Sequence, residues 1–488
     1  MNTISKWLVP ALLMTLTGIG IQSAKSQTLT TLHSFSGPDG DGPWGSLIQA
    51  TNGSLYGVTF LGGGDSDGTM FKISLDGGLK TVATFGPDGA TGPLGLMQDS
   101  NGDFYGTTIY GAAPGEGNGT VFKLTPNGKL TILVSLDGAN GSLPAALIQA
   151  TNGNLYGTTE EGGTYSDGTV FTLTKRGTLT TIQSFDGTDG FEPVANAGLI
   201  QATDGNFYGT TILGGTYSSG TVFKITPSGE LTTLYNFCSQ LNCADGIYPE
   251  AGLIQASDGN FYGTTVEGGT NGSCWVYVTC GTVYRITPSG EFTSLYSFCS
   301  QPNCSDGANP FAGLIQATDG NLYGTTTYGG NGNNGELNGD AGTVFKITTA
   351  GELTTVYRFC SVFTDNLCMD GDLPGNLTQA TNGDLYGTTQ DGGAVTFGGG
   401  TVFRLTVGLG PFVALRTTSG EVGTNVGILG TELTGASSVT FNGTPSTFKI
   451  VSKSEIEATV PIGATTGTIT VTTPRGVLSS SKSFTVQE

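Results

Sequence analysis

The fourth of a series of repeats decides the fold, and it reads AGLIQATDG at 197–205, NFYGTTILGG at 206–215, SGTVFKITPSG at 219–229 and ELTTLYNF at 230–237. The four segments are rich in Thr, Val, Ile, Tyr and Phe, which favour strands. The TDG and PSG between them supply residues that tolerate positive φ in tight turns. One unit is therefore expected to be a four-stranded antiparallel meander.

A Tyr-Gly pair preceded by Leu or Phe marks each copy of this unit. It recurs at intervals of 49 to 63 residues, at Tyr56, Tyr105, Tyr156, Tyr208, Tyr262, Tyr323 and Tyr386. A meander of this size can bury its faces only against its neighbours, so seven copies are expected to form a ring or an open stack.

The ends of the repeat region favour the ring. A fourth-strand segment, LTTLHSF at 29–35, precedes the first unit, whereas the fourth segment is missing after the last GTVF strand at 400–406. In a closed ring the N-terminal strand completes the last blade and removes the exposed sheet edges at the seam. The sequence therefore predicts an all-β fold, with a seven-bladed β-propeller over residues 27–406 that is closed by the N-terminal strand.

The full unit follows the pattern D-G-x-x-P, then L-I-Q-A-x-[ND]-G-x-[LF]-Y-G-T-T, G-G, G-T-V-F-[KR]-[IL]-T and L-T-x-L. Over roughly 380 residues this pattern resembles the exported bacterial proteins called GloVer-repeat or choice-of-anchor tandem-repeat proteins. The resemblance implies a secreted or surface protein without an assigned activity, often with a sorting anchor after the repeats. We expect no such anchor here, because neither a hydrophobic tail nor a sortase motif follows the repeats.

A different pattern follows residues 407–411, which are expected to be a linker. Residues 412–488 contain short strands with alternating apolar and polar residues, as in a small Ig-like β-sandwich. They include G-x-x-L-T-G-A, V-T-F-N-G, V-P-x-G-A and a closing F-T-V, and they resemble the IPT/TIG immunoglobulin-like domain. In exported bacterial proteins this resemblance implies a spacer or an adhesive module.

The N-terminus has the features of a signal peptide over residues 1–26. Lys6 precedes an apolar run of about 15 residues, and small residues precede Gln27. A retained anchor is the alternative, but the run is short for a membrane span, which needs about 20 residues. No later segment could span a bilayer. The protein is therefore expected to be secreted or displayed at the cell surface, without a membrane span in the mature chain.

All eight cysteines lie in close pairs between positions 238 and 368. In an oxidising compartment, local disulfides are the expected state of such pairs. A zinc site is the alternative, although the pairs lack the shorter spacing of zinc knuckles. The expected bonds are Cys238–Cys243, Cys274–Cys280, Cys299–Cys304 and Cys360–Cys368.

Composition excludes several functions. Gly accounts for 82 of 488 residues, and charged residues make up only 11%. The formal net charge of −20 argues against nucleic acid as a partner and against anionic membranes. The single His, His33, occupies an ordinary strand position, so triad and His-metal chemistries lack the residues they need. We expect a monomer without a required cofactor.

The candidate site lies in two variable connections, those with D-G-x-x-P and those with Gly-Gly, which should emerge on one face of the ring. Glu161, Glu267 and Asp391 share one position before Gly-Gly and are candidate ligand-binding acids or a candidate hydrolytic pair. Solvated rim acids are the alternative. Trp44 and Trp275 offer stacking faces or loop packing. The preferred contacts are Glu267 and Trp275.

Two further features of the repeats have open interpretations. Loop acids such as Asp39 and Asp41 could bind Ca²⁺, although none fits the EF-hand spacing. The Gln of LIQA recurs in every unit, and hydrogen bonding between blades explains it more simply than a ligand.

Three functions remain. The favoured one is a binding or adhesion module that recognises a glycan or a surface protein through the loops. The alternatives are a structural envelope protein without a discrete ligand, and an enzyme that acts on polysaccharide through paired carboxylates.

Overall fold

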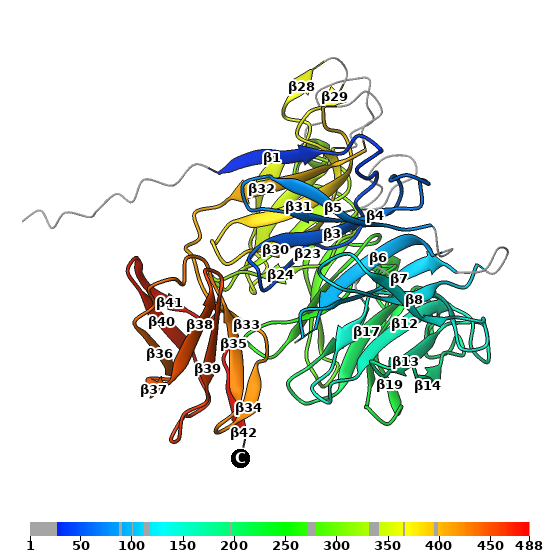
Figure 1. Ribbon diagram of the computed structural model, residues 1–488. Helices are drawn as coiled ribbons and strands as arrows, with labels where there is room; N and C mark the ends of the chain where they lie inside the picture. Colours follow the sequence, from blue (N-terminus) through cyan, green and yellow to red (C-terminus); the bar gives the residue numbers. More distant parts are fainter. Residues whose placement is uncertain are drawn as a thin grey trace, which may run out of the picture.

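The regular secondary structure of the described residues is almost entirely β-strand (Figure 1). The computed structural model describes residues 27–86, 90–99, 101–111, 117–194, 198–271, 280–330, 341–364, 367–394 and 399–487. The expected signal peptide, residues 1–26, lies outside this part of the chain. In the described part, the helices are two short 3-10 turns, η1 (Leu241–Cys243) and η2 (Pro302–Cys304). None of these described helices is long and apolar enough to cross a membrane.

The described part of the repeat region contains seven antiparallel sheets of four or five strands each, and these sheets follow the predicted units. The first three consist of β2 (Ile48–Gln49), β3 (Leu55–Thr59), β4 (Thr69–Ile73) and β5 (Leu79–Thr84); of β6 (Thr91–Gln98), β7 (Phe104–Tyr110), β8 (Thr120–Leu124) and β9 (Leu130–Ser135); and of β10 (Ser142–Pro144), β11 (Ile148–Gln149), β12 (Leu155–Glu161), β13 (Thr169–Leu173) and β14 (Leu179–Ser184).

The next three sheets repeat this order. They consist of β15 (Phe191–Pro193), β16 (Ile200–Gln201), β17 (Phe207–Leu213), β18 (Thr221–Ile225) and β19 (Leu231–Asn236); of β20 (Ile254–Gln255), β21 (Phe261–Thr265), β22 (Thr282–Ile286) and β23 (Phe292–Ser297); and of β24 (Ile315–Gln316), β25 (Leu322–Thr326), β26 (Thr343–Ile347) and β27 (Leu353–Arg358).

The last sheet combines both ends of the repeat region. Its strands are β30 (Asp372–Gln379), β31 (Leu385–Asp391), β32 (Thr401–Thr406) and β1 (Thr28–Ser34), and a separate hairpin, β28 (Phe363–Thr364) and β29 (Leu367–Cys368), precedes them. β1 pairs antiparallel with β32, from Thr28 opposite Thr406 to Ser34 opposite Thr401. The strand that precedes the first unit therefore supplies the missing fourth strand of the seventh.

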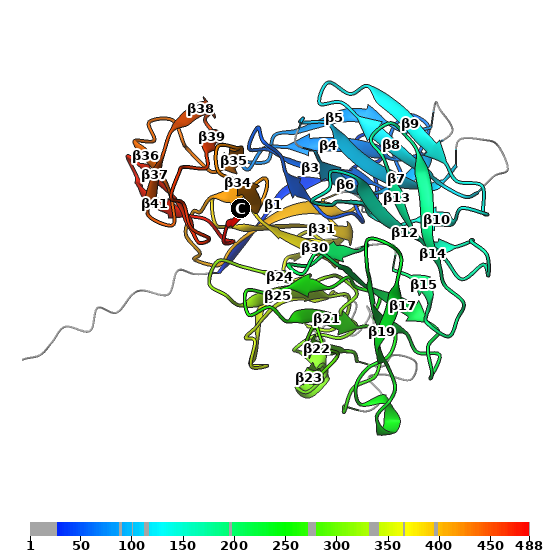
Figure 2. The ribbon, with the colours of Figure 1, turned by 90° about the horizontal axis from the view of Figure 1, so that it is seen from below.

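Hydrophobic cores lie between neighbouring sheets, which follow one another in sequence order in Figure 2. Phe85 at the end of the first unit contacts Phe122 of the second, with ring centroids 5.1 Å apart. Phe35, which follows β1, contacts Phe71 of the first unit at the same distance of 5.1 Å. The strand paired with the seventh unit thus packs its Phe against the first unit, as the Phe after the fourth strand of the first, third, fourth, fifth and sixth units does toward the next unit.

The repeated Gln side chains connect neighbouring units. In the described residues, six of them accept a hydrogen bond from a backbone N–H of the preceding unit: Gln98 from Thr51, Gln201 from Thr151, Gln255 from Thr203, Gln316 from Ser257, Gln379 from Thr318 and Gln49 from Thr381. The donor expected for Gln149, Ser100, lies outside the described residues. The interpretation that these amides join blades agrees with this pattern.

The C-terminal domain is a β-sandwich with its own core. Its strands are β33 (Ala414–Leu415), β34 (Ser419–Glu421), β35 (Asn425–Leu429), β36 (Ser438–Phe441), β37 (Thr444–Ser446), β38 (Phe448–Ser452), β39 (Glu455–Thr459), β40 (Ile469–Thr473), β41 (Gly476–Ser479) and β42 (Thr485–Gln487). The two main sheets have the orders β33-β35-β39-β38 and β37-β36-β40-β41. Buried Val426, Ile456 and Phe441 belong to the core between them.

The C-terminal domain contacts the tight turns between the first and second strands of the repeats. Ser454 donates to the carbonyl of Thr51 in the first unit at 2.9 Å. The hydroxyls of Thr431 and Thr381, in the seventh unit, are 2.9 Å apart. Arg416 donates to the carbonyl of Asp99 in the second unit at 3.1 Å. The domain therefore lies on the side of the tight turns and contacts units on both sides of the β1–β32 pairing.

Candidate binding site on the loop face

The two variable connections of each unit meet at one edge of its sheet. We call the set of them the loop face: the connections from fourth to first strand, 35–47, 85–90, 136–141, 185–190, 237–253, 298–314 and 359–371, those from second to third strand, 60–68, 111–119, 162–168, 214–220, 266–281, 327–342 and 392–400, and the strand residues that flank them. Backbone bridges join the two kinds of connection, for example Ile247 to Glu267 and Ala308 to Tyr328. The loop face lies away from the turns that the C-terminal domain contacts.

Exposed apolar side chains gather on the loop face. In the described part of the repeat region, every large apolar side chain that is exposed lies here: Trp44, Leu61, Tyr110, Tyr165, Tyr217, Leu241, Val362 and Phe363. Tyr165 and Tyr217 are 61% and 50% exposed and hold the same repeat position in adjacent units. Exposed Tyr and Trp provide large contact area at low entropic cost, so this set favours a binding surface.

Disulfides shape three loops of this face. The bonds Cys238–Cys243, Cys299–Cys304 and Cys360–Cys368 each close a loop of the fourth-to-first connection. Cys280 is also disulfide-bonded, and its expected partner Cys274 lies outside the described residues. Disulfides are typical of extracellular proteins, and they favour that location here.

A buried carboxylate anchors each disulfide loop. Asp245 is fully buried, and its Oδ2 accepts hydrogen bonds from the Tyr235 hydroxyl at 2.7 Å and from the Ser239 N–H at 2.9 Å. In the first connection, His33 replaces this Tyr and contacts Asp39 through Nε2 at 2.7 Å. These acids therefore hold the loops in shape, so the carboxylate of Asp39 is engaged within its own connection.

The residue before the Pro of each D-G-x-x-P motif has a positive φ. In the third to sixth units these residues are Leu143, Glu192, Tyr248 and Asn309, with φ between 52° and 56°. A side chain in this backbone conformation is strained, and such strain is common at functional positions. The N–H of each donates to a carbonyl of the preceding unit, as Glu192 does to Asp167 at 3.3 Å. The positive φ and this backbone hydrogen bond therefore orient the side chains of these four residues, which differ in chemistry.

Three carboxylates from successive units interact on the loop face. Burial raises the pKa of Glu160 to about 7, and the charges of Glu192, Glu161 and Glu250 add to the rise. Burial also raises the pKa of Glu250 to about 7, with contributions from Glu267 and Glu192. The pKa of Glu192 is raised by burial and then by Glu161. These glutamates therefore form an acidic cluster across the third, fourth and fifth units.

The predicted acids occupy the edge of this cluster. Glu161 is exposed at the end of β12, opposite Ser142, and Glu267 is half-buried beside Ile247. Both affect the pKa of cluster members, but Asp391 does not. The pKa of Asp391 is raised instead by burial and by Asp41 of the first unit. The structure therefore connects two of the three predicted acids to one cluster and places the third beside another unit.

Of the two candidate tryptophans, Trp44 lies within the described residues and Trp275 does not. Trp44 is 40% exposed and stacks on Phe60, with ring centroids 4.9 Å apart and an interplanar angle of 10°. Its exposed part remains available for a ligand on the loop face. Trp275 lies outside the described residues, as does most of its loop.

Glu160, Glu192 and Glu250 were not among the site residues predicted from the sequence. The sequence could have indicated them, because each is an acidic residue at a repeat position where other units have different residues. Glu160 follows Thr-Thr, where other units have residues such as Phe60 and Ile212. Glu192 and Glu250 flank the Pro of their motifs. No group of three or more His, Cys, Asp or Glu side chains in the described residues has an arrangement that could hold a metal ion.

The architecture defines an all-β, propeller-like repeat protein with a C-terminal Ig-like domain. The chain belongs to the Gloeobacter/Verrucomicrobia repeat family, whose pattern matches residues 20–200 and 194–366. Residues 412–486 match the IPT/TIG domain. No curated protein matches the sequence.

Solved structures with similar folds share little sequence with the chain. A fungal alcohol oxidase of the AA5 family, in complex with copper, is 12% identical with a TM-score of 0.52, over 94% of this chain and 99% of the other. The extracellular domain of a protein described as a one-component system from Bacteroides thetaiotaomicron is 12% identical with a TM-score of 0.48, over 93% and 58% of the two chains. At this identity the likeness to the oxidase concerns the fold alone.

Proposed function

We propose that the seven sheets form a closed seven-bladed β-propeller in which β1 is the last strand. Three contacts between the seventh and first units support it: the Thr381 N–H to Gln49 Oε1 at 2.9 Å, the Gly42 N–H to the Gly399 carbonyl at 3.0 Å, and the Phe35–Phe71 contact. The same three kinds of contact join other neighbouring units. A closed propeller leaves only short, protected sheet edges and holds its loops rigidly.

On this scaffold we propose a secreted or cell-surface binding module that recognises a glycan or a surface protein through the loop face. The observation that carries the proposal is the confinement of the exposed Trp, Tyr, Leu, Val and Phe side chains of the described repeats to that face. The C-terminal domain contacts the opposite turns and leaves the loop face accessible.

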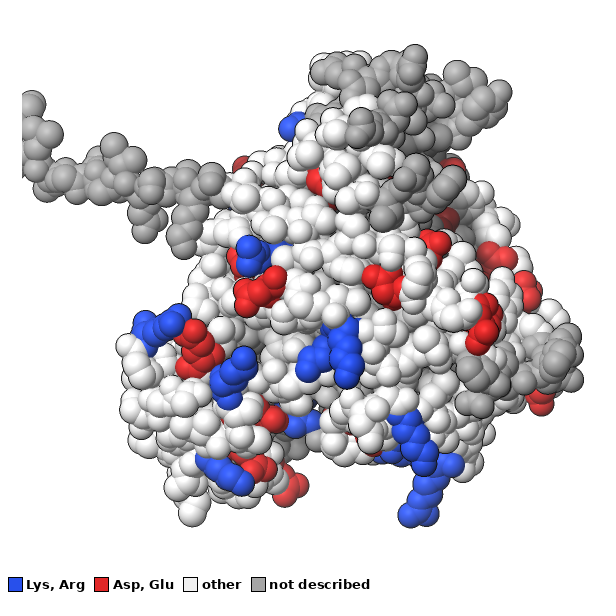
Figure 3. Space-filling model, turned by 45° about the horizontal axis from the view of Figure 1, so that its top comes forward, with Lys and Arg blue, Asp and Glu red and all other residues white. Residues whose placement is uncertain are grey.

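A neutral glycan is the ligand that fits this surface best. Sugars stack on aromatic rings, and Tyr165, Tyr217 and Trp44 expose theirs. The acidic cluster offers hydrogen-bond acceptors, while a net charge of −20 repels acidic polymers at low salt. Uncharged residues cover most of the surface seen in Figure 3, which also suits an uncharged ligand.

The test is a panel of glycans presented to the chain without its leader. Tyr165→Ala combined with Tyr217→Ala is expected to weaken binding at least fivefold, which corresponds to about 1 kcal/mol. Glu267→Ala and Trp44→Ala should weaken it as well. Ile462→Ala is the matched control, because it removes an apolar side chain that is 90% exposed on the C-terminal domain.

The outcomes separate the three function classes. Retention of a glycan that the Tyr variants lose and the control keeps supports the binding module. Turnover of a polysaccharide by the wild type, lost on Glu250→Gln, would instead establish an enzyme. Failure of the whole panel, together with failure to retain any surface protein, would overturn the proposal in favour of a structural role.

A further inference from the structure

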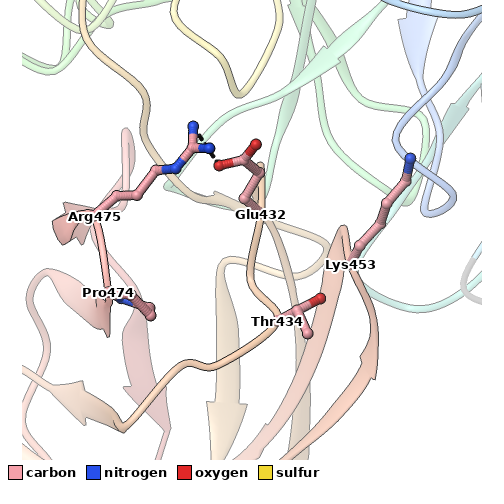
Figure 4. Close-up of a pocket in the computed structure, with 5 residues that line it drawn as sticks. All are labelled: Glu432, Thr434, Lys453, Pro474 and Arg475. Carbon is pink, nitrogen blue, oxygen red and sulfur yellow. Dashed lines mark ion pairs between the residues drawn. The ribbon is translucent and has the colours of Figure 1, made fainter.

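A hollow on the C-terminal domain is lined by two cationic side chains. It has a volume of about 280 Å³ and is lined by Glu432, Thr434, Lys453, Pro474 and Arg475 (Figure 4). The residues come from three separate turns: those before β36, between β38 and β39, and between β40 and β41. The hollow is therefore assembled by the fold of the domain and not by one local sequence.

The hollow lies close to the repeats. Thr431, which precedes Glu432, contacts Thr381 of the seventh unit, and Ser454, which follows Lys453, contacts Thr51 of the first. Two of its turns are thus held in place by the tight turns of the repeats. A group bound here would sit beside the junction of the two domains.

Arg475 already forms an ion pair with a carboxylate of the same domain. The Glu432 Oε2 lies 2.5 Å from Arg475 Nη1, and Figure 4 shows the two side chains pointing toward each other. Glu432 has a positive φ of 58°, a strained conformation for a side chain of its size. By contrast, Lys453 forms no ion pair within the described residues. The hollow therefore has one satisfied cation and one cation still available.

The C-terminal domain differs in charge from the repeats. Residues 412–488 contain five Lys or Arg and five Asp or Glu, whereas residues 27–406 contain 11 and 33. An anion is therefore repelled less by this domain than by the ring. The planar guanidinium of Arg475 matches the geometry of a carboxylate, sulfate or phosphate group, and an ammonium and a hydroxyl line the same hollow.

We propose that this hollow is a binding site for an oxyanion, a carboxylate, sulfate or phosphate group, which displaces the Glu432 carboxylate from Arg475. Lys453 and Thr434 line the same hollow. Such a group is carried by acidic polysaccharides and by phosphate-bearing surface polymers. The site is distinct from the loop face and gives the chain a second point of attachment.

The test measures binding of three probes to the full chain without its leader: inorganic phosphate, inorganic sulfate and a uronic acid oligomer, each compared with NaCl at equal ionic strength. Arg475→Gln and Lys453→Gln are expected to weaken binding at least tenfold. Glu432→Gln removes the competing carboxylate and should strengthen it about fivefold. Lys449→Gln, which changes an exposed lysine on β38 outside the hollow, is the matched control and should bind like the wild type.

The increase on Glu432→Gln is the decisive result, because loss of a purely structural ion pair would not improve anion binding. An affinity for all three probes that Glu432→Gln leaves unchanged, or that Lys449→Gln lowers as much as Arg475→Gln, would overturn the proposal. Binding of the uronic oligomer but not of sulfate or phosphate would identify a carboxylate ligand. The reverse would identify a sulfated or phosphorylated one.

Discussion

Replacement of Gln49 by Ala tests whether the repeats close into a ring. The Gln49 amide accepts from the Thr381 N–H at 2.9 Å and donates to the Gly53 carbonyl at 3.2 Å. At about 1 kcal/mol for each bond, and more for a donor left without a partner, the substitution should lower the free energy of unfolding by about 2–3 kcal/mol. If the ring were open, the bond to Thr381 would be absent and the loss would fall to about 1 kcal/mol.

Gln201 provides a matched control within the same chain. It makes the same two bonds, with the Thr151 N–H at 2.8 Å and the Gly205 carbonyl at 3.1 Å, but it joins units that follow one another directly. Equilibrium unfolding in urea should therefore give the two Ala variants equal losses within about 0.5 kcal/mol. A loss at Gln201 with little at Gln49 would refute closure. A chain that begins at Asp39, and so lacks β1, should lose cooperative unfolding or solubility.

Three further predictions concern buried polar groups. The Tyr284 hydroxyl is buried without a hydrogen-bond partner, so Tyr284→Phe should raise the free energy of unfolding in urea by about 1 kcal/mol. The pKa values of Glu160 and Glu250 are raised from 4.5 to about 7, so between these pH values the folded state binds more protons than the unfolded state. The melting temperature should therefore fall as pH rises from 4.5 to 7. Glu250→Gln should make that fall smaller. Asp245→Ala removes a fully buried acceptor and should cost roughly 2–4 kcal/mol of unfolding free energy, whereas Asp76→Ala in a tight turn should cost little.

Internal repetition made the fold predictable. The seven copies place seven residues in each equivalent structural position. Positions that hold the same residue in every copy, such as the Gln of LIQA, therefore identify residues that every sheet requires for its structure. The displaced segment at 29–35 indicated that the first strand belongs to the last sheet, and β1 pairs with β32 as that segment requires. The local disulfides followed from the spacing of the cysteines and the short reach of a five- to eight-residue loop.

The acidic cluster could not be predicted, because it depends on how neighbouring sheets are offset. The positive-φ residue of one unit lies beside the residue after Thr-Thr in the preceding unit: a Cβ on Gly92 would meet the Phe60 ring at 2.8 Å, and Asn309 Nδ2 donates to the Val266 carbonyl at 2.9 Å. By the same offset Glu192 approaches Glu160, 32 positions earlier in the chain. The repeat pattern aligns equivalent positions, such as Glu161 and Glu267, whereas the packing joins positions that are not equivalent.

The placement of the C-terminal domain could not be predicted either, since two of its contacts, Arg416 to Asp99 and Ser454 to Thr51, join residues more than 300 positions apart. These contacts have a functional consequence. Because the domain is held against the tight turns of the first, second and seventh units, the aromatic loop face and the cationic hollow belong to different sides of one molecule. A glycan on the loop face and an oxyanion at the junction would therefore not compete for space, and the chain could bind both at once. Because the two sites lie on different sides, they would join two separate ligands, and they would not strengthen the binding of a single flat surface.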